Sequence, residues 1–323
     1  MELNPDIIDK VKQLQAKYAA MGQDLESYLD GLLYADYLTY WEYIKLDTLL
    51  SLQSPITPFP DEEIFIMYHQ ITELYFKLTL HEFEQIASRE NLDKAFLVAR
   101  VQRINRYFEA LTKSFDIMVD GMEREQFLKF RMSLLPASGF QSAQYRMIEI
   151  WSTSFDRLVA KDERHRYNAD FKAENIAQMY EHIYWKRGAT ELQSGEKTLT
   201  LKQFEIKYSK DLIELAERAY GNTLIDQVCR LPEADQQDPA LIEGLKWLDT
   251  NVNVNWPLAH YKSAVRYLQR APEDIAATGG TNWQKYLPPR FQKRIFFEEV
   301  WSAEEIDNWG RGWVESVIVN LKK

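Results

Sequence analysis

The amino-acid sequence predicts an all-α protein, and three observations support this prediction. Glycine is scarce, with 12 in 323 residues, which is below its usual frequency in globular proteins. Apolar residues recur in most segments at the three- and four-residue spacing of an amphipathic helix, and no segment alternates between apolar and polar residues as a half-buried strand does. No fixed-period repeat and no linker rich in proline, glycine and serine is present. We therefore expect one helical-bundle domain over residues 1–323, with helical excursions.

The N-terminal region is expected to form two helices. Asn4 followed by Pro5 is a helix cap with a proline in the first turn. A second helix is expected over residues 25–52, and the prolines between residues 55 and 60 end it. A tyrosine stripe runs along this second helix, and such a stripe usually lies in a core or an interface. Its members are Tyr37, Tyr40 and Tyr43.

The next helix is expected to be central. Asp61 and the two glutamates after it lie where a helix start favours negative charge, and the sequence is apolar on most of the helix surface as far as about Ser88. Ser302 with Glu305 forms a capping box for a final helix. We interpret three arginines as a solvated helix face, namely Arg100, Arg103 and Arg106. Other helices are expected over residues 92–119, 123–134, 141–157, 173–186, 202–219 and 238–269, with an interruption near Trp256 and Pro257.

Charge and composition limit the classes of function. Asp plus Glu number 49 and Lys plus Arg number 39, which gives a net charge of −10. An acidic chain repels phosphate backbones and anionic lipid, so we expect no nucleic-acid partner and no membrane partner. No apolar run approaches the ~18 residues of a membrane span, and no leader peptide is recognisable. The single cysteine, Cys229, fits a reducing compartment. We expect a cytoplasmic protein.

Motifs for nucleotide and zinc-protease chemistry are missing, since the sequence contains no G-x-G-x-x-G, G-x-x-x-x-G-K-S/T or H-E-x-x-H. No two histidines have the spacing that would place them on one helical face as metal ligands. A single axial imidazole remains possible, because haem needs only one protein ligand. The five histidines are His69, His81, His165, His182 and His260.

Three side chains are candidates for chemistry. His69 lies on a helical stripe with Phe65, Thr72 and Phe76, and the spacing alone favours a core histidine satisfied by a neighbour over a catalytic group. His260 follows a proline and small residues that would leave room for a flat macrocycle, but an ordinary histidine at a helix break is the default. Arg131 precedes a loop, where it fits a carboxylate clamp or a structural ion pair equally well.

Four segments in this order resemble the tryptophan 2,3-dioxygenase family. They are YWEYIKLDTLLSLQ at residues 40–53, the segment from Asp61 through FIMYHQ at residues 65–70, the segment from Phe130 through ASGFQS at residues 137–142, and His260 with the later Thr278-Gly279-Gly280. The resemblance covers residues 30–155 well and residues 245–290 more loosely. It implies a homotetramer with haem b (Fe2+) between helices, which cleaves the indole C2–C3 bond of L-tryptophan with O2 to give N-formyl-L-kynurenine.

The resemblance also implies roles for individual residues. His260 would be the axial ligand of the haem iron, with Trp256 as a neighbour, and His69 would accept a hydrogen bond from the indole N–H. Arg131 would hold the substrate carboxylate. The other implied substrate contacts are Phe65 on the indole, Ser138 and Thr278 near the amino-acid end, and Tyr40, Tyr43 and Ile44, which would reach from residues 1–55 into the active site of a neighbouring subunit.

The sequence departs from the family pattern in two loops. Residues 58–60 read Pro-Phe-Pro where relatives often carry histidine, and residues 277–282 read ATGGTN where many relatives have glycine before and serine after. The gap from His260 to Thr278 is also a few residues longer than usual, which bears on the register of Thr278. The alternatives are a divergent haem enzyme acting on a modified tryptophan or another indole, a non-catalytic haem-binding helical protein, and a monomeric indoleamine dioxygenase, which the YxxY segment disfavours.

Overall fold

The structure is a computed structural model that describes residues 4–134, 136–167, 172–191, 194–268 and 294–309. Within these ranges the secondary structure is helical, apart from two isolated bridges that pair Val159 with Ile183 and Thr190 with Lys197. The all-α prediction is therefore confirmed. The chain forms two compact units, Met1–Gln53 and Ser54–Lys323. None of the described helices has the length and apolar character that a membrane span requires.

The first unit contains more helix breaks than expected. Helix α1 (Pro5–Ala20) begins at the predicted cap, where Asn4 Oδ1 accepts from Asp6 N at 2.9 Å. The prediction of a single helix over residues 25–52 is wrong, because Tyr37 and Lys45 have φ of 52° and 55°. A residue with left-handed backbone cannot continue a right-handed helix. The region instead contains α2 (Leu25–Leu33), α3 (Tyr40–Tyr43) and α4 (Leu46–Leu49).

The first unit buries little of its own apolar surface. Leu25 is the one buried residue among the described residues 4–53. Tyr40 and Tyr43 on α3 are 70% and 75% exposed. A large uncovered apolar surface commonly marks a site of interaction with another molecule or subunit. The tyrosine stripe is therefore not part of a core within the first unit.

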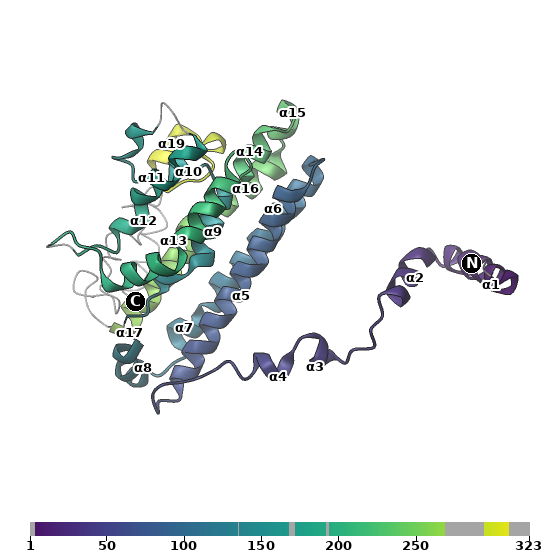
Figure 1. The fold of residues 1–323 in the computed structure, drawn as a ribbon, viewed down its shortest axis with the longest axis horizontal. Coiled ribbons are helices and arrows are strands. Elements are labelled where there is room, and N and C mark those ends of the chain that lie inside the picture. Colours follow the sequence, from purple (N-terminus) through teal and green to yellow (C-terminus); the bar gives the residue numbers. More distant parts are fainter. Residues whose placement is uncertain (1–3, 135, 168–171, 192–193, 269–293, 310–323) are drawn as a thin grey trace. The chain divides into compact units, whose positions relative to one another are not determined.

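The second unit is built on a pair of long helices, α5 (Asp61–Ser88) and α6 (Lys94–Ser114), which lie side by side (Figure 1). The ends predicted for α5 are confirmed, and its first turn carries three acidic residues. Phe76 of α5 and Phe108 of α6 are both buried, with ring centroids 6.1 Å apart. Burial of aromatic rings between the two helices places the core of this unit along α5 and α6.

A buried carboxylate also joins α5 to α6. Glu82 accepts from Arg100 at 3.1 Å and from Tyr107 at 3.1 Å, and it forms an ion pair with Arg103 at 2.8 Å. The solvated-face interpretation is therefore wrong for Arg100. Arg103 keeps 42% of its side chain exposed while it pairs with Glu82, and Arg106 is exposed as expected. A carboxylate that folding removes from water requires cationic or hydrogen-bonding partners, and Arg100 and Arg103 reach across the helix pair to provide them.

Shorter helices surround this pair. Most of the long helices expected between residues 92 and 186 are each divided into two shorter helices. Helix α13 begins three residues earlier than expected. The elements, in order, are α7 (Asp116–Asp120), α8 (Arg124–Phe130), η1 (Arg131–Leu134), η2 (Gly139–Gln141), α9 (Ala143–Ser152), α10 (Phe155–Leu158), η3 (Arg164–Arg166), η4 (Ala173–Asn175), α11 (Ile176–Glu181), α12 (Tyr184–Arg187), α13 (Leu199–Ala219), α14 (Leu224–Cys229) and α15 (Glu233–Gln236).

The C-terminal helices contain the second notable difference from prediction. Helix α16 (Pro239–Thr250) continues through the π turn η5 (Asn251–Asn255) into α17 (Trp256–Leu268). The interruption expected near Pro257 is thus a change of hydrogen-bond register rather than a break. After the segment that ends at residue 293, the chain forms η7 (Glu298–Val300) and then α19 (Ala303–Asp307), which begins at the predicted Ser302 capping box.

Candidate functional site

His69 lies on α5 with its ring against aromatic surface. Its Nδ1 is 2.7 Å from Phe65 O, and the two rings are 4.1 Å apart. Because a carbonyl only accepts, Nδ1 carries the proton and Nε2 keeps its lone pair. Burial lowers the pKa of His69 below its usual range, although the bond to Phe65 and the charge of Glu73 act in the opposite direction. The ring is therefore neutral at neutral pH.

His260 lies on α17 in the same chemical form. Its Nδ1 is 3.1 Å from Trp256 O, so Nε2 is again the nitrogen with the lone pair. The ring lies 4.3 Å from the Trp256 ring and 4.5 Å from the Phe115 ring. Burial lowers the pKa of His260 to about 4, opposed by the bond to Trp256 and reinforced by the electrostatic interaction with the His69 ring when that ring is protonated. A neutral imidazole is the form that binds a metal.

Aromatic contacts join the two histidines into one region of the interior. The Trp256 ring lies 5.8 Å from Phe76, which belongs to the same stripe of α5 as His69. Phe115 packs on both Trp256 and His260, at 5.2 and 4.5 Å. Protonation of His69 would also disfavour protonation of His260. The structure thus brings together the two histidines that the sequence singled out.

Phe65 extends this region toward α8. Its ring is 5.7 Å from the Phe130 ring in an edge-on arrangement and 6.4 Å from the Phe127 ring. Phe130 is fully buried, and Arg131 follows it directly at the start of η1. Arg131, the candidate ligand for a carboxylate, therefore directly follows an aromatic cluster that includes Phe65, whose ring lies beside His69.

Ser138 lies in a loop with defined geometry. It caps η2, with its hydroxyl accepting from Phe140 N at 3.4 Å and its own N–H donating to Gln141 Oε1 at 3.2 Å. Gln141 Nε2 in turn donates to Thr200 O at 3.2 Å, which ties the loop to α13. These bonds join Ser138 to its own loop and the loop to α13, and none of them reaches His69 or His260.

The remaining predicted site residues lie either in the first unit or outside the described residues. Tyr40, Tyr43 and Ile44 belong to the first unit, Met1–Gln53. Thr278 lies outside the described residues, as do the two glycines after it. By contrast, sequence reasoning missed Phe115, whose ring packs on His260. Phe115 directly follows α6 and continues the apolar spacing of Phe108 and Leu111, which is the signal that indicates a core position.

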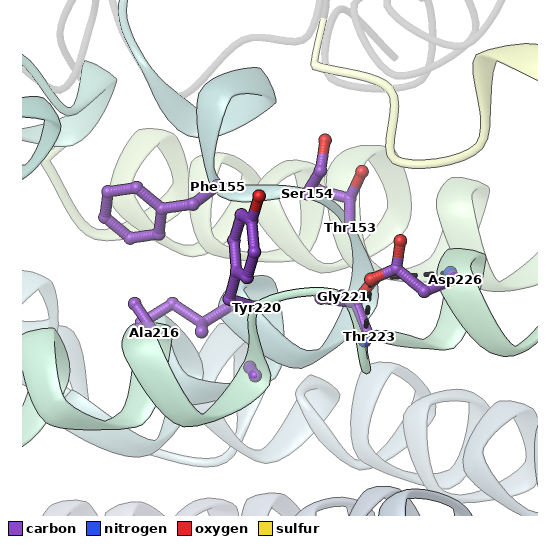
Figure 2. A pocket seen from close by; sticks show the side chains of 10 residues that line it. Thr153, Ser154, Phe155, Ala216, Tyr220, Gly221, Thr223 and Asp226 are labelled. Atoms are coloured by element: carbon purple, nitrogen blue, oxygen red, sulfur yellow. Dashed lines mark hydrogen bonds between the residues drawn. The ribbon is translucent and has the colours of Figure 1, made fainter. Parts of the chain in front are cut away.

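A cavity of about 250 Å3 lies elsewhere, between the ends of α9 and α13 and the start of α14 (Figure 2). Its lining contains no histidine. Its hydroxyl groups already have protein partners, since Thr153 donates to Phe296 O at 2.7 Å and Thr223 donates to Asp226 at 2.6 Å. Among the described residues no group of three or more His, Cys, Asp or Glu side chains forms a metal site. The candidate site is therefore the histidine pair.

Comparison with known proteins gives a consistent result. The family model described as tryptophan 2,3-dioxygenase matches residues 31–238. The tryptophan 2,3-dioxygenase of Bacillus cereus (strain ZK / E33L) is 31% identical over 276 residues, which cover 82% of this chain and 91% of that protein. The protein of the same name from Bacillus thuringiensis subsp. konkukian (strain 97-27) is 29% identical over 273 residues, with the same coverage of both chains. The one from Ruegeria sp. (strain TM1040) is 40% identical over 119 residues, which cover 36% of this chain and 42% of that protein.

Proposed function

Because the chain belongs to the tryptophan 2,3-dioxygenase family, we propose that it uses O2 to cleave the indole C2–C3 bond of L-tryptophan, giving N-formyl-L-kynurenine, with haem b held by His260. The chain is an enzyme of this family, and tryptophan dioxygenase activity follows from membership. The observation that carries the finer proposal is the pair of neutral imidazoles on α5 and α17. In both rings Nδ1 is bonded to a backbone carbonyl and Nε2 keeps its lone pair.

The residues around His260 fit an axial haem ligand. The bond from Nδ1 to Trp256 O orients the ring, and metal-bound histidines usually make such a bond to a carbonyl or carboxylate. Trp256 and Phe115 provide apolar walls suited to a flat macrocycle. One imidazole is sufficient because haem brings its own four nitrogen ligands. When bound, the haem iron supplies the activation of O2, which amino-acid side chains do not provide.

The indole end of the substrate would be oriented by α5. Phe65 packs on the indole ring, and His69 Nε2 accepts a hydrogen bond from the indole N–H. The bond between His69 Nδ1 and Phe65 O holds the acceptor atom in place, and the lowered pKa keeps it unprotonated. A substrate held in this way loses its rotational freedom before the reaction, which is a large part of the barrier to a bimolecular step.

The amino-acid end of the substrate would be bound by charge. Arg131 forms a bidentate pair with the carboxylate, and its position directly after Phe130 supports this role because the Phe130 ring packs on Phe65. Ser138 and Thr278 contact the same end of the substrate. An apolar wall followed by a cation matches the two halves of L-tryptophan.

We further propose that residues 1–323 act as one helical domain in a homotetramer, in which residues 1–55 complete the site of a neighbouring subunit through Tyr40, Tyr43 and Ile44. The exposure of both tyrosines supports this role. Helix α5 also exposes an apolar stripe with heptad-like spacing that fits a subunit interface, namely Met67, Ile71, Leu74 and Leu78. The acidic composition and single cysteine support a cytoplasmic location.

Reconstitution with haem tests the proposal. The reduced protein is mixed with O2 and L-tryptophan, and growth of the N-formylkynurenine absorbance band is followed. His260→Ala should abolish the ferrous haem spectrum. His69→Ala should keep the haem and lower kcat/KM about fivefold, which corresponds to one lost hydrogen bond of about 1 kcal/mol.

His81→Ala is the matched control, because His81 lies exposed on the same helix and should change neither quantity. Haem binding without product would favour a divergent enzyme acting on another indole, or a non-catalytic haem-binding protein. No haem binding would overturn the role of His260.

A further inference from the structure

The helix that carries His260 reaches this residue through the π turn η5. In that turn Trp256 N–H donates to Asn251 O, five residues earlier. A π turn adds one residue to the helical path, and one residue rotates an α-helix by about 100° and lengthens it by about 1.5 Å. The direction of every α17 side chain relative to α16, His260 included, therefore depends on whether this turn is maintained.

Pro257 explains why the turn needs outside partners. Proline has no N–H, so the carbonyl five residues before it, Val252 O, lacks the backbone donor that a π register would give it. The Tyr145 hydroxyl donates to Val252 O at 2.9 Å and supplies the missing bond. Asn251 and Asn255 form a further chain, in which Asn255 donates to Asn251 at 3.0 Å and Asn251 donates to Asn105 of α6 at 3.1 Å.

The third asparagine of the turn, Asn253, is held on both sides of its amide. Its Nδ2 donates to Asp249 Oδ1 at 2.8 Å, and its Oδ1 accepts from Arg294 Nε. Arg294 also pairs with the buried Glu149 at 2.9 Å. The orientation of the Asn253 amide, and with it the middle of the π turn, is therefore determined by two charged side chains.

Asp249 connects the turn to a distant part of the chain. It is fully buried and accepts four hydrogen bonds. One comes from Asn253, and the other three come from the backbone N–H groups of Phe296 and Phe297, at 2.7 and 3.1 Å, and from Trp301 Nε1 at 3.0 Å. We call residues 295–301 the clamp segment. The single carboxylate satisfies the turn and the clamp segment at the same time.

The clamp segment is itself fixed to the second unit. Phe296 and Phe297 are fully buried. Phe296 O accepts from Thr153 at 2.7 Å and from Arg157 at 3.0 Å. Because Phe296 is also bonded to Thr153 and Arg157, the clamp segment has anchors besides Asp249, and it can hold this carboxylate in position against the π turn.

We propose that Asp249 is a positioning residue, which maintains the π turn by joining it to the clamp segment and thereby sets the direction in which His260 presents Nε2. This inference rests on the proposed function only where it concerns haem. Asp249 touches neither substrate nor haem in this scheme. Its effect reaches the site through Asn253 and the helix register.

Three variants test the connection in the full-length protein. Asp249→Asn places a donor where the carboxylate accepted, and it removes at least two of the four bonds. Asn253→Ala disconnects the turn but leaves Asp249 bonded to the clamp segment. Trp301→Phe removes a single bond on the opposite side. Glu82→Gln is the matched control, because Glu82 is an equally buried carboxylate that joins α5 to α6 away from the turn.

Two measurements are made on each variant. The first is amide hydrogen exchange of residues 251–260 in the haem-free chain. The second is the rate of haem loss together with the iron–histidine stretching band of the reduced, reconstituted protein. Asp249→Asn and Asn253→Ala should speed exchange of residues 251–260 at least tenfold, shift the iron–histidine band, and weaken haem binding about 10- to 100-fold, as loss of an outer-shell partner does. Glu82→Gln should change exchange in α5 and α6 only.

The proposal is overturned if Asp249→Asn alters residues 251–260 and the iron–histidine band no more than Glu82→Gln does. If Asp249→Asn does not fold, Asn253→Ala and Trp301→Phe decide the question, with the larger effect on residues 251–260 expected for Asn253→Ala and the reverse order refuting the link. If the unsubstituted protein binds no haem, the proposed function fails, while hydrogen exchange still shows whether Asp249 maintains the turn.

Discussion

Protonation of His260 gives a direct test of the packing at the site. Burial holds the pKa of this imidazole at about 4 in the folded, haem-free chain, against about 6.5 in an unfolded chain. As the pH falls from 6.5 to 4, the unfolded state takes up a proton that the folded state does not. This group therefore stabilises the fold above pH 6.5, and the stabilisation is lost as the pH falls through that window.

The magnitude follows from the two pKa values. When the pH falls from 7 to 5, the difference between the folded and unfolded pKa of His260 lowers the free energy of unfolding by about 2 kcal/mol. Asp249 acts in the opposite sense, because burial raises its pKa to about 6. Over the same interval its protonation in the folded state adds about 1 kcal/mol. The two effects partly cancel, so only a comparison of variants isolates His260.

The assay is urea unfolding of the haem-free protein at pH 7 and pH 5, at one fixed protein concentration because subunit association shifts apparent stability. His260→Gln should reduce the loss of stability on acidification by about 2 kcal/mol relative to the unsubstituted chain. His81→Gln, on the exposed side of α5, should change it by less than about 0.5 kcal/mol. An unchanged pH dependence in His260→Gln would show that the imidazole is hydrated, and would refute the packing described around it.

Three further predictions use other parts of the second unit. Between pH 7 and pH 5, Asp249→Asn should lose about 1 kcal/mol more stability than the unsubstituted chain, because the folded carboxyl with its raised pKa no longer takes up a proton; the same urea titrations measure this difference, and equal losses in the two proteins contradict the assignment. Phe76→Ala should cost about 3–5 kcal/mol of unfolding free energy, since Phe76 is buried against Trp256; a loss below about 1 kcal/mol in urea unfolding would contradict it. Leu74→Glu, at a side chain 49% exposed on α5, should lower the assembled mass in light scattering, and an unchanged mass would remove the stripe from the subunit interface.

Local signals in the sequence predicted the elements whose structure depends on neighbouring residues. The acidic start and apolar run of residues 61–88, the Asn4 cap and the Ser302 capping box all have counterparts in the structure. Each of these signals acts within one helical turn, so it operates in the same way wherever the helix lies in the fold.

The split of residues 25–52 was not predicted, because apolar spacing continues through residues with left-handed backbone. Tyr37 and Lys45 are not residue types that commonly adopt positive φ. A local signal was present, however, at Thr39. Its capping box with Glu42 starts a new helix, and it lies in the middle of the expected one.

The π turn could be predicted only in part. Pro257 inside a helical pattern indicates an irregularity in the helix, but a break, a kink and a π turn are all consistent with that signal. The choice among them depends on Tyr145 and Asp249, which lie in other elements. In the same way, the assignment of Arg100 to solvent failed because its partner, Glu82, lies 18 residues earlier on a different helix.

The candidate site likewise has a part that the local sequence predicted and a part that depends on residues distant in the chain. The stripe of Phe65 and His69 was visible in the sequence, while the packing of Phe115 on His260 depends on how the junction of α6 and α7 meets α17. Spacing alone did not separate a core histidine from a functional one. The Nδ1 partner of each ring and the direction of its pKa shift, which together identify the nitrogen that keeps the lone pair, both require coordinates.

The Nδ1 partner of each histidine is the carbonyl four residues earlier on its own helix, which is also the acceptor of the histidine's own backbone N–H in regular α-helical geometry. The helix itself therefore assigns the tautomer, and no neighbouring side chain has to be retained for that purpose. Substitutions in the surrounding walls can alter the shape of the candidate site while both rings keep the lone pair on the same nitrogen. This arrangement separates the tautomer of each ring from the shape of the walls around it, so substitutions in loops such as residues 58–60 leave the lone pair on Nε2 of both imidazoles.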